Sequence, residues 1–129
     1  MNIRSVYVPF LRNAMLEPLS IFDTANPNVV TGRRTQTVLP GQALYLMNSP
    51  FVRDQAKHSA TVFLARQPDG ELDTISTLEQ AWLLVLGRPP TESEIETMSP
   101  LLGSAAPDQQ VWTDVFQMLF GSIDFRFVD

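Results

Sequence analysis

The sequence predicts an all-α protein: a bundle of about five helices, preceded by a short extended segment and a long irregular loop. Apolar residues recur at helical spacing through most of residues 41–120. Capping residues and glycines mark the expected helix ends, and proline-containing turns separate the periodic segments. Because 129 residues fit one domain, we expect a single helical domain over 1–129, with an arm and loop over 1–40 and a helical core over 41–129.

The arm and the loop are expected from the first 40 residues. Residues 4–11 (RSVYVPFL) combine β-branched and aromatic residues with Pro9, which predicts a short extended segment or an edge strand. Such a strand needs a partner, and no other segment is a convincing one. Residues 23–40 place Thr31 and Gly32 in a polar run that indicates an irregular connection. Ordered loops of this length are uncommon and tend to be functional.

Two helices are predicted between the loop and the Pro-Asp-Gly turn at residues 68–70. Pro40 suits a first helical turn, which residues 42–48 continue. Ser49 and Pro50 then begin the second helix, with serine as its N-cap and proline at its first position. The apolar positions of this second helix repeat at spacings of four, four and three, and so line one face: Val52, Ala56, Ala60 and Phe63.

Three more helices are predicted after that turn. The first spans about 77–86, where the run AWLLVL indicates burial on most sides and Gly87 supplies a C-terminal cap. Thr91 and Glu94 have the spacing of a capping box, which begins the next helix. The last spans about 108–120, and its broad apolar stripe indicates two neighbours. We expect one core cluster from the inner residues of these helices: Trp82, Val85, Leu86, Ile95, Met98, Val111, Trp112, Phe116 and Phe120.

Composition and charge exclude several classes of function. No apolar run is long enough for membrane insertion, and the absence of cysteine removes disulfides and thiolate chemistry. The net charge of −5 is unevenly distributed: residues 1–67 carry seven Arg and Lys against three Asp and Glu, whereas residues 68–129 carry two against eleven. The acidic half argues against nucleic acid as a partner. The basic half either docks on the acidic half or faces an anionic partner.

No catalytic set, metal site or cofactor site can be assembled from the sequence. His58 has only Asp54 one turn away, and it lies off the apolar stripe of its helix, so we expect an exposed residue. Glu92, Glu94 and Glu96 lie in the first turns of a helix, where the helix dipole stabilises negative charge. We therefore predict no catalytic residue, no metal ion and no cofactor for this chain.

The one candidate ligand site lies in the long loop, at Thr31, Gly32, Arg33 and Arg34. Glycine permits a tight turn, and adjacent arginines can hold a carboxylate or a phosphate through paired hydrogen bonds. The alternative is that the arginines form structural ion pairs, with Asp23 or with the acidic half of the chain, and that alternative is favoured because such pairs outnumber ligand sites.

Four long stretches together resemble a known family. RSVYVPFLRNAMLEPLSIFDTANPNVVTGRR, PGQALYLMNSPFV, LGRPPTESE and the closing FGSIDFRFVD are similar to the C-terminal part of the planctomycete PSD family, domain of unknown function 1553. The resemblance implies a fragment of a large multidomain bacterial protein that is exported to the periplasm or the cell surface. It also implies that Met1 is not the natural start. It supplies no catalytic residue, and the haem motif C-x-x-C-H of such proteins is absent here.

Three hypotheses for function follow. The leading one is a non-catalytic helical interaction domain at the C-terminus of a larger exported protein, whose partners are the remaining domains of that polypeptide or another protein. The second is that Arg33 and Arg34 contribute to a composite enzyme site or anionic-ligand site completed by upstream domains. The third is a free-standing cytoplasmic binding domain. The oligomeric state does not follow from the sequence.

Overall fold

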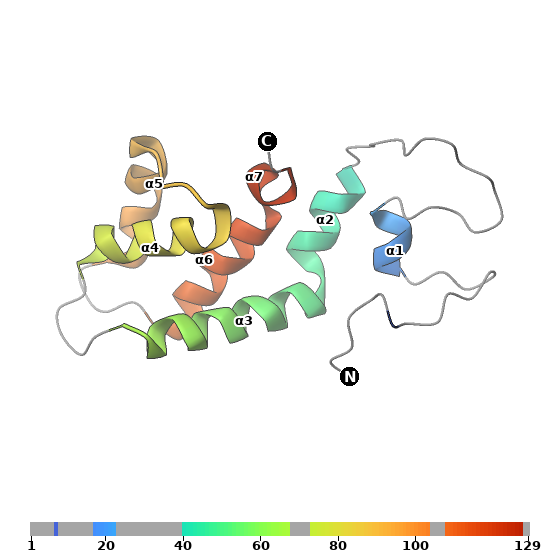
Figure 1. Ribbon diagram of the computed structural model, residues 1–129, viewed down its shortest axis with the longest axis horizontal. Coiled ribbons are helices and arrows are strands. Elements are labelled where there is room, and N and C mark those ends of the chain that lie inside the picture. Colours follow the sequence, from blue (N-terminus) through green and yellow to red (C-terminus); the bar gives the residue numbers. More distant parts are fainter. Residues whose placement is uncertain (1–6, 8–16, 23–39, 68–72, 104–107, 128–129) are drawn as a thin grey trace. The chain divides into compact units, whose positions relative to one another are not determined.

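The computed structural model describes residues 7, 17–22, 40–67, 73–103 and 108–127 (Figure 1). Within these ranges every regular element is helical, which confirms the predicted all-α class. The chain divides into two compact units, 1–42 and 43–129. A single domain over the whole chain stays a prediction. The helices are α1 Glu17–Ile21, α2 Pro40–Asn48, α3 Pro50–Ala65, α4 Thr74–Leu86, α5 Glu92–Leu102, α6 Gln109–Gly121 and α7 Ile123–Arg126.

The described part of the first unit consists of Tyr7, helix α1 and the start of α2. The sequence did not predict α1, which is a single short turn of helix closed by the hydrogen bond from the Phe22 amide to the Pro18 carbonyl. The buried side chain of Gln42 donates to the carbonyl of Ile21 at 3.1 Å, which satisfies an acceptor at the end of α1. The expected extended segment at 4–11 lies outside the described residues except for Tyr7, which is exposed.

Helices α2 and α3 begin and end as the prolines and Ser49 predict. Pro40 starts α2, and Pro50 occupies the first turn of α3, where its missing N–H costs nothing. Ser49 is the N-cap by backbone geometry, but its side chain makes no capping hydrogen bond. The predicted inner face of α3 is confirmed, since all four of its residues are buried: Val52, Ala56, Ala60 and Phe63.

Helix α4 differs from its prediction in its start and in its burial. It begins at Thr74 because Asp73 is the N-cap and its carboxylate accepts from the Ser76 amide at 3.3 Å. Gly87 caps the other end in the left-handed conformation, as predicted. Burial on most sides is wrong: Leu83 and Leu84 are 52% and 63% exposed. Only the face that carries Thr77, Leu78, Ala81 and Trp82 is covered by neighbouring helices.

The capping box at the start of α5 is confirmed. The Thr91 hydroxyl accepts from the Glu94 amide at 3.3 Å, and the Glu94 carboxylate accepts from the Thr91 amide at 2.6 Å. Helix α6 follows, with Asp108 at its N-cap position. Helix α7 was not predicted; it begins where the Ser122 hydroxyl accepts from the Phe125 amide.

The core of the second unit forms where α6 packs along α3 and also contacts α4 and α7 (Figure 1). Trp82 and Trp112 are almost fully buried, and Phe63, Trp112 and Phe116 form a group of ring contacts with centroids 4.9 to 6.4 Å apart. The predicted cluster is confirmed, because all nine of its residues are either buried in this core or packed against it.

Candidate functional site

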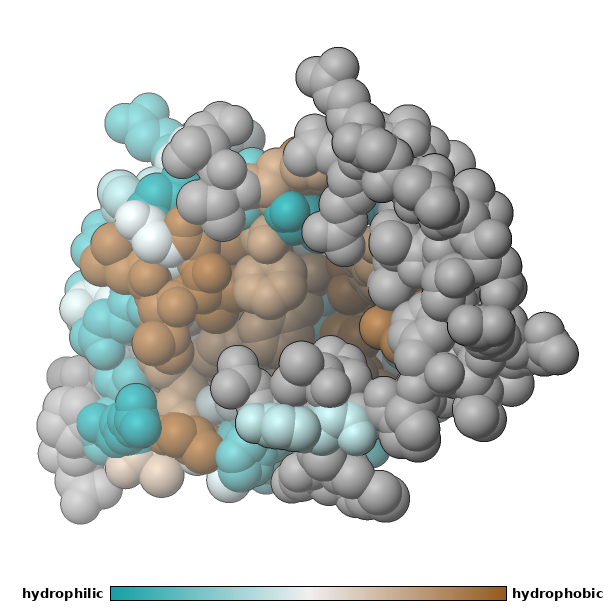
Figure 2. All heavy atoms as spheres, turned by 45° about the vertical axis from the view of Figure 1, so that its right-hand side comes forward, coloured by the Kyte–Doolittle hydropathy of each residue, from teal (hydrophilic) through white to brown (hydrophobic). Residues whose placement is uncertain are grey.

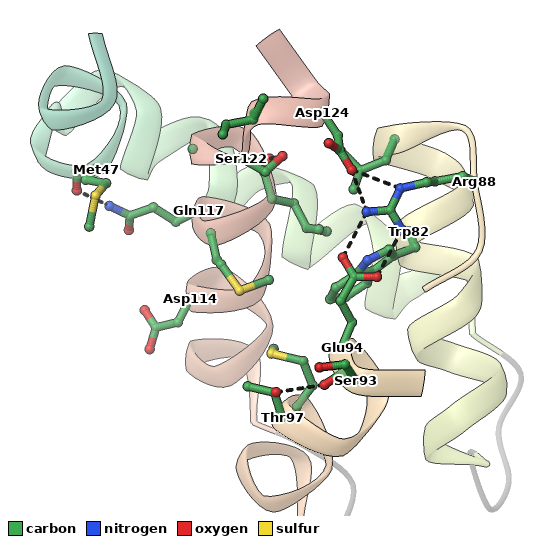
Figure 3. A pocket seen from close by; sticks show the side chains of 16 residues that line it. Met47, Trp82, Arg88, Ser93, Glu94, Thr97, Asp114, Gln117, Ser122 and Asp124 are labelled. Carbon is green, nitrogen blue, oxygen red and sulfur yellow. Dashed lines mark hydrogen bonds and ion pairs between the residues drawn. The ribbon is translucent and has the colours of Figure 1, made fainter. Parts of the chain in front are cut away.

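An apolar pocket of about 740 Å³ opens on the second unit, between residues of α2, α4, α5, α6 and α7 (Figure 3). Its floor belongs to the core, since Trp82, Met98 and Leu119 are all buried. The pocket's size is within the range that is typical of ligand sites. The pocket therefore gives a molecule at the surface access to side chains of the hydrophobic core.

The edge of the pocket carries apolar side chains that remain in contact with solvent. We call Met47, Met118 and Ile123 the lip; their side chains are 61%, 45% and 66% exposed. Figure 2 shows brown, apolar side chains gathered on one face of the described chain, with teal hydrophilic residues along part of their border. Contiguous apolar surface of this kind is typical of sites that bind another molecule.

Methionine is the most frequent residue type in this apolar lining. Three of the five methionines in the chain line the pocket: Met47 from α2, Met98 from α5 and Met118 from α6. Methionine is unbranched and polarisable, so that its side chain adapts to partners of different shape. The lining can therefore adjust to apolar groups of varied size.

Arg88 forms the polar end of the pocket, just after the end of α4 (Figure 3). Its Nη1 and Nη2 donate to the two carboxylate oxygens of Glu94, both at 2.9 Å. Its Nε and Nη2 donate to Oδ2 of Asp124, at 2.9 and 2.5 Å. One guanidinium therefore joins the end of α4 to the first turns of α5 and α7.

The pKa of Glu94 is lowered from 4.5 to about 2 by this arrangement. The hydrogen bonds from Arg88 are the largest cause; partial burial opposes them, and the Thr91 amide adds to them. The indole N–H of Trp82 also stabilises the ionised carboxylate through its dipole, although it makes no hydrogen bond of good geometry. The same contacts raise the pKa of Arg88. Both groups are charged at neutral pH.

The pocket holds more negative than positive charge. We call Glu94, Asp114 and Asp124 the acidic rim; among the described residues that line the pocket, Arg88 is the one cationic side chain. Asp114 lies on α6, on the side away from Arg88 (Figure 3), and accepts a hydrogen bond from the uncharged amide of Gln110 at 2.9 Å. The described part of the lining therefore carries an excess of two negative charges.

Gln117 and α7 hold the walls of the pocket in place. The Gln117 amide donates to the Met47 carbonyl at 2.6 Å, which ties α6 to the end of α2 (Figure 3). Helix α7 is held by Asp124 and by the ring of Phe125, whose centroid is 5.2 Å from that of Phe120. The pocket shape therefore depends on contacts between segments far apart in the sequence.

The residues singled out from the sequence do not meet in this pocket. Thr31, Gly32, Arg33 and Arg34 lie outside the described residues, so their ligand-binding role stays a prediction. His58 is exposed on α3, as predicted.

The acidic residues of α5 have separate surroundings. Glu92 and Glu96 are exposed, whereas Glu94 faces Arg88. Among the described residues, no group of three His, Cys, Asp or Glu side chains is placed to hold a metal ion.

Arg88 was not among the residues to which the sequence assigned a role. The sequence does contain one signal for its contact with Glu94, which is six residues later. The turn between them begins after the glycine cap of α4 and ends at the capping box of α5, so the two side chains have to lie close together. The second partner, Asp124, is 36 residues away and gives no local signal.

Comparison with known families identifies the chain. The family described as "Protein of unknown function (DUF1553)", PSD1, matches residues 1–102, which include α5 and the four lining residues that it supplies. The chain belongs to this family. The matched span ends before α6, although α6 supplies much of the core and one wall of the pocket.

Two further comparisons add no relative. No curated protein and no solved structure gives a significant match. No helix in the described part of the chain has the length and apolar character needed to cross a membrane.

Proposed function

We propose that the 43–129 unit is a non-catalytic interaction domain whose pocket receives apolar side chains of a protein segment. The observation that carries this proposal is the lip: Met47, Met118 and Ile123 expose apolar surface directly around a floor of buried core residues. Apolar side chains that enter the pocket are removed from water against an adaptable surface. Amphipathic helices bind grooves of this kind through residues spaced at i, i+3, i+4 and i+7.

The polar groups of the pocket favour binding over catalysis. Glu94 has a pKa of about 2, so it stays ionised near neutral pH and is a poor proton donor or acceptor there. Both Glu94 and Asp124 are engaged by Arg88, which fixes the helices around the pocket. The charged groups Arg88, Glu94 and Asp124 are therefore explained by a structural role.

The family resemblance supports a partner within a longer polypeptide. The resemblance implies large multidomain members that are usually exported, so we expect the natural occupant to be a segment of a neighbouring domain or of another protein at the cell surface or in the periplasm. The alternative is a composite enzyme site or anionic-ligand site that uses Arg33 and Arg34. The pocket itself does not favour an anion, because its lining has an excess of carboxylates.

The proposal can be tested by methyl NMR on the full 129-residue chain labelled at its five methionines. The probe is a synthetic peptide with leucines at i, i+3, i+4 and i+7 and otherwise uncharged residues. We expect saturable shifts of the Met47, Met98 and Met118 methyls, with smaller changes at Met1 and Met15. Shifts of equal size at all five methyls would contradict the proposal.

Two matched variants make this test specific. Met47 and Leu44 lie one turn apart on α2 and are equally exposed, at 61% and 60%, but only Met47 lines the pocket. Met47→Ser should therefore weaken peptide binding, whereas Leu44→Ser should leave it unchanged. Equal effects of the two substitutions would show that the peptide binds elsewhere.

A further inference from the structure

We infer that the pocket selects apolar protein segments that carry a lysine or an arginine beside their apolar side chains. This inference rests on the proposed binding function and adds a charge preference to it. Its basis is the unequal distribution of charge around an otherwise apolar lining.

Asp114 is the group best placed to make that selection. Glu94 and Asp124 are already bonded to the guanidinium of Arg88, whereas Asp114 lies on the other side of the pocket and is exposed to solvent (Figure 3). Its hydrogen bond comes from the uncharged Gln110 amide, and no cationic side chain among the described residues pairs with it. A cation of the bound segment can therefore pair with Asp114 without disrupting the Arg88 cluster.

The side-chain chemistry of lysine and arginine fits this position. Met118 is four residues after Asp114 on α6, so the carboxylate and an apolar side chain of the lip share one face of the helix. Lysine and arginine can lay their aliphatic stems on apolar surface while the charged end stays in water. One such side chain can therefore contact Met118 and reach Asp114.

The wider charge distribution favours the same class of partner. Residues 68–129 carry two Arg and Lys against eleven Asp and Glu, so the chain that surrounds the pocket attracts cationic segments at long range. The same charge opposes an anionic ligand, and it opposes a second copy of this unit because two acidic surfaces repel each other. A cationic, apolar segment of a protein is the occupant that satisfies both the lining and the charge.

The inference can be tested with three peptides that share the leucine spacing given above and differ at one flanking position: lysine, norleucine or glutamate. On the full chain, we expect the lysine peptide to bind about two- to fivefold more tightly than the norleucine peptide. The glutamate peptide should bind most weakly. Higher salt should remove the differences, because exposed charges are screened.

Asp114→Asn isolates the residue that we assign to the selection. It should remove most of the lysine preference, measured as the ratio of the affinities for the lysine and norleucine peptides. Asp54→Asn is the control, because Asp54 is an exposed carboxylate on α3 outside the pocket. Equal binding of the lysine and norleucine peptides, or a lysine preference that survives in Asp114→Asn, would overturn the inference while leaving the proposed function intact. Failure of all three peptides to shift the pocket methionines would instead contradict the proposed function.

Discussion

The guanidinium of Arg88 and the carboxylate of Glu94 meet through two parallel hydrogen bonds of 2.9 Å. The same carboxylate accepts the Thr91 amide at 2.6 Å, so Glu94 closes the capping box of α5 while it holds Arg88. Asp124 binds the other edge of the guanidinium and brings α7 to the same point. The capping box that starts α5 is thereby linked, through Arg88, to the long-range contact with Asp124 that shapes the pocket.

Arg88→Lys should lower the free energy of unfolding by about 1 kcal/mol, since the three groups are only partly exposed and form a network. Lysine retains the charge, but an ammonium group cannot present a planar fork to two carboxylates. Urea denaturation measures the change. Arg53→Lys, at an exposed position of α3, is the matched control and should have almost no effect. Equal stability of Arg88→Lys and the parent would mean that the paired hydrogen bonds of the guanidinium do not contribute to the free energy of unfolding.

Glu94 should contribute a specific acid dependence to stability. The pKa of Glu94 is about 2 in the folded chain and 4.5 in the absence of its partners, as in the unfolded chain. Between pH 2 and pH 4.5, the unfolded chain therefore binds a proton at Glu94 that the folded chain does not. The stabilisation is therefore complete above pH 4.5 and is lost as the pH falls toward 2. We expect it to amount to about 1 kcal/mol after allowance for solvent screening.

Glu94→Gln tests that pH dependence without removing the capping box, because glutamine can also accept the N-cap amide. Urea denaturation at several pH values between 2 and 6 should show a shallower acid slope in the variant than in the parent. Glu92→Gln, which removes an exposed carboxylate from the same first turn, is the matched control for the loss of one charge. The same slope in parent and Glu94→Gln would exclude the assigned pKa.

Thr91→Ala should destabilise the protein by about 1 kcal/mol, because its hydroxyl is the acceptor for the Glu94 amide at the start of α5. Ser93→Ala is the control, since Ser93 lies in the same turn and its carbonyl, which the substitution retains, accepts from Thr97. A denaturation midpoint in Thr91→Ala equal to that of the control would mean that the cap contributes nothing.

Local signals predicted most helix ends, except the start of α4, where the cap at Asp73 was missed. Long-range packing decides which faces of the helices are buried. Gly87 and the Thr91–Glu94 box act within a few residues, so that the sequence pattern is enough to identify them. In the run AWLLVL, by contrast, apolar character alone does not indicate which face the neighbouring helices cover. Trp82 is buried and Leu84 is exposed because α5, α6 and α7 meet only one side of α4.

The pocket was beyond sequence reasoning for the same physical reason. Met47, Met98 and Met118 come from three helices, and each alone has the appearance of an ordinary core residue. Asp124 reaches Arg88 only because the unpredicted α7 turns back toward the end of α4. The family resemblance was predicted from long motifs and is confirmed over residues 1–102.

Substitutions at a buried and at an exposed residue of α4 should differ strongly in their effect on the free energy of unfolding. Trp82→Ala should cost about 3–5 kcal/mol, because the indole is almost fully buried and its removal leaves a cavity. Leu84→Ala, two residues later on an exposed face, should cost less than about 1 kcal/mol. Chemical denaturation of both variants checks the difference. Similar losses in the two variants would mean that the exposed face of α4 is covered in solution.

Arg33 and Arg34 carry the remaining prediction from the sequence. We expect them to order the long polar loop through carboxylate partners, with Asp23 the nearest in the chain, because few apolar residues there can do so. The planar fork of arginine suits it to several acceptors at once. Arg33→Ala should therefore lower the melting temperature modestly, and the parent should bind sulfate or acidic saccharides only weakly.

The composite-site alternative predicts the opposite pattern for the same variant. If Arg33 and Arg34 hold an anionic ligand, the parent should bind it with a salt-sensitive affinity, because the contact is between charges accessible to solvent. Arg33→Ala would then lose that affinity and keep its melting temperature. Calorimetric titration of parent and variant with the same anions at two salt concentrations separates the two cases. Micromolar binding by the parent that disappears in the variant, at unchanged melting temperature, would refute the structural role and favour the ligand site.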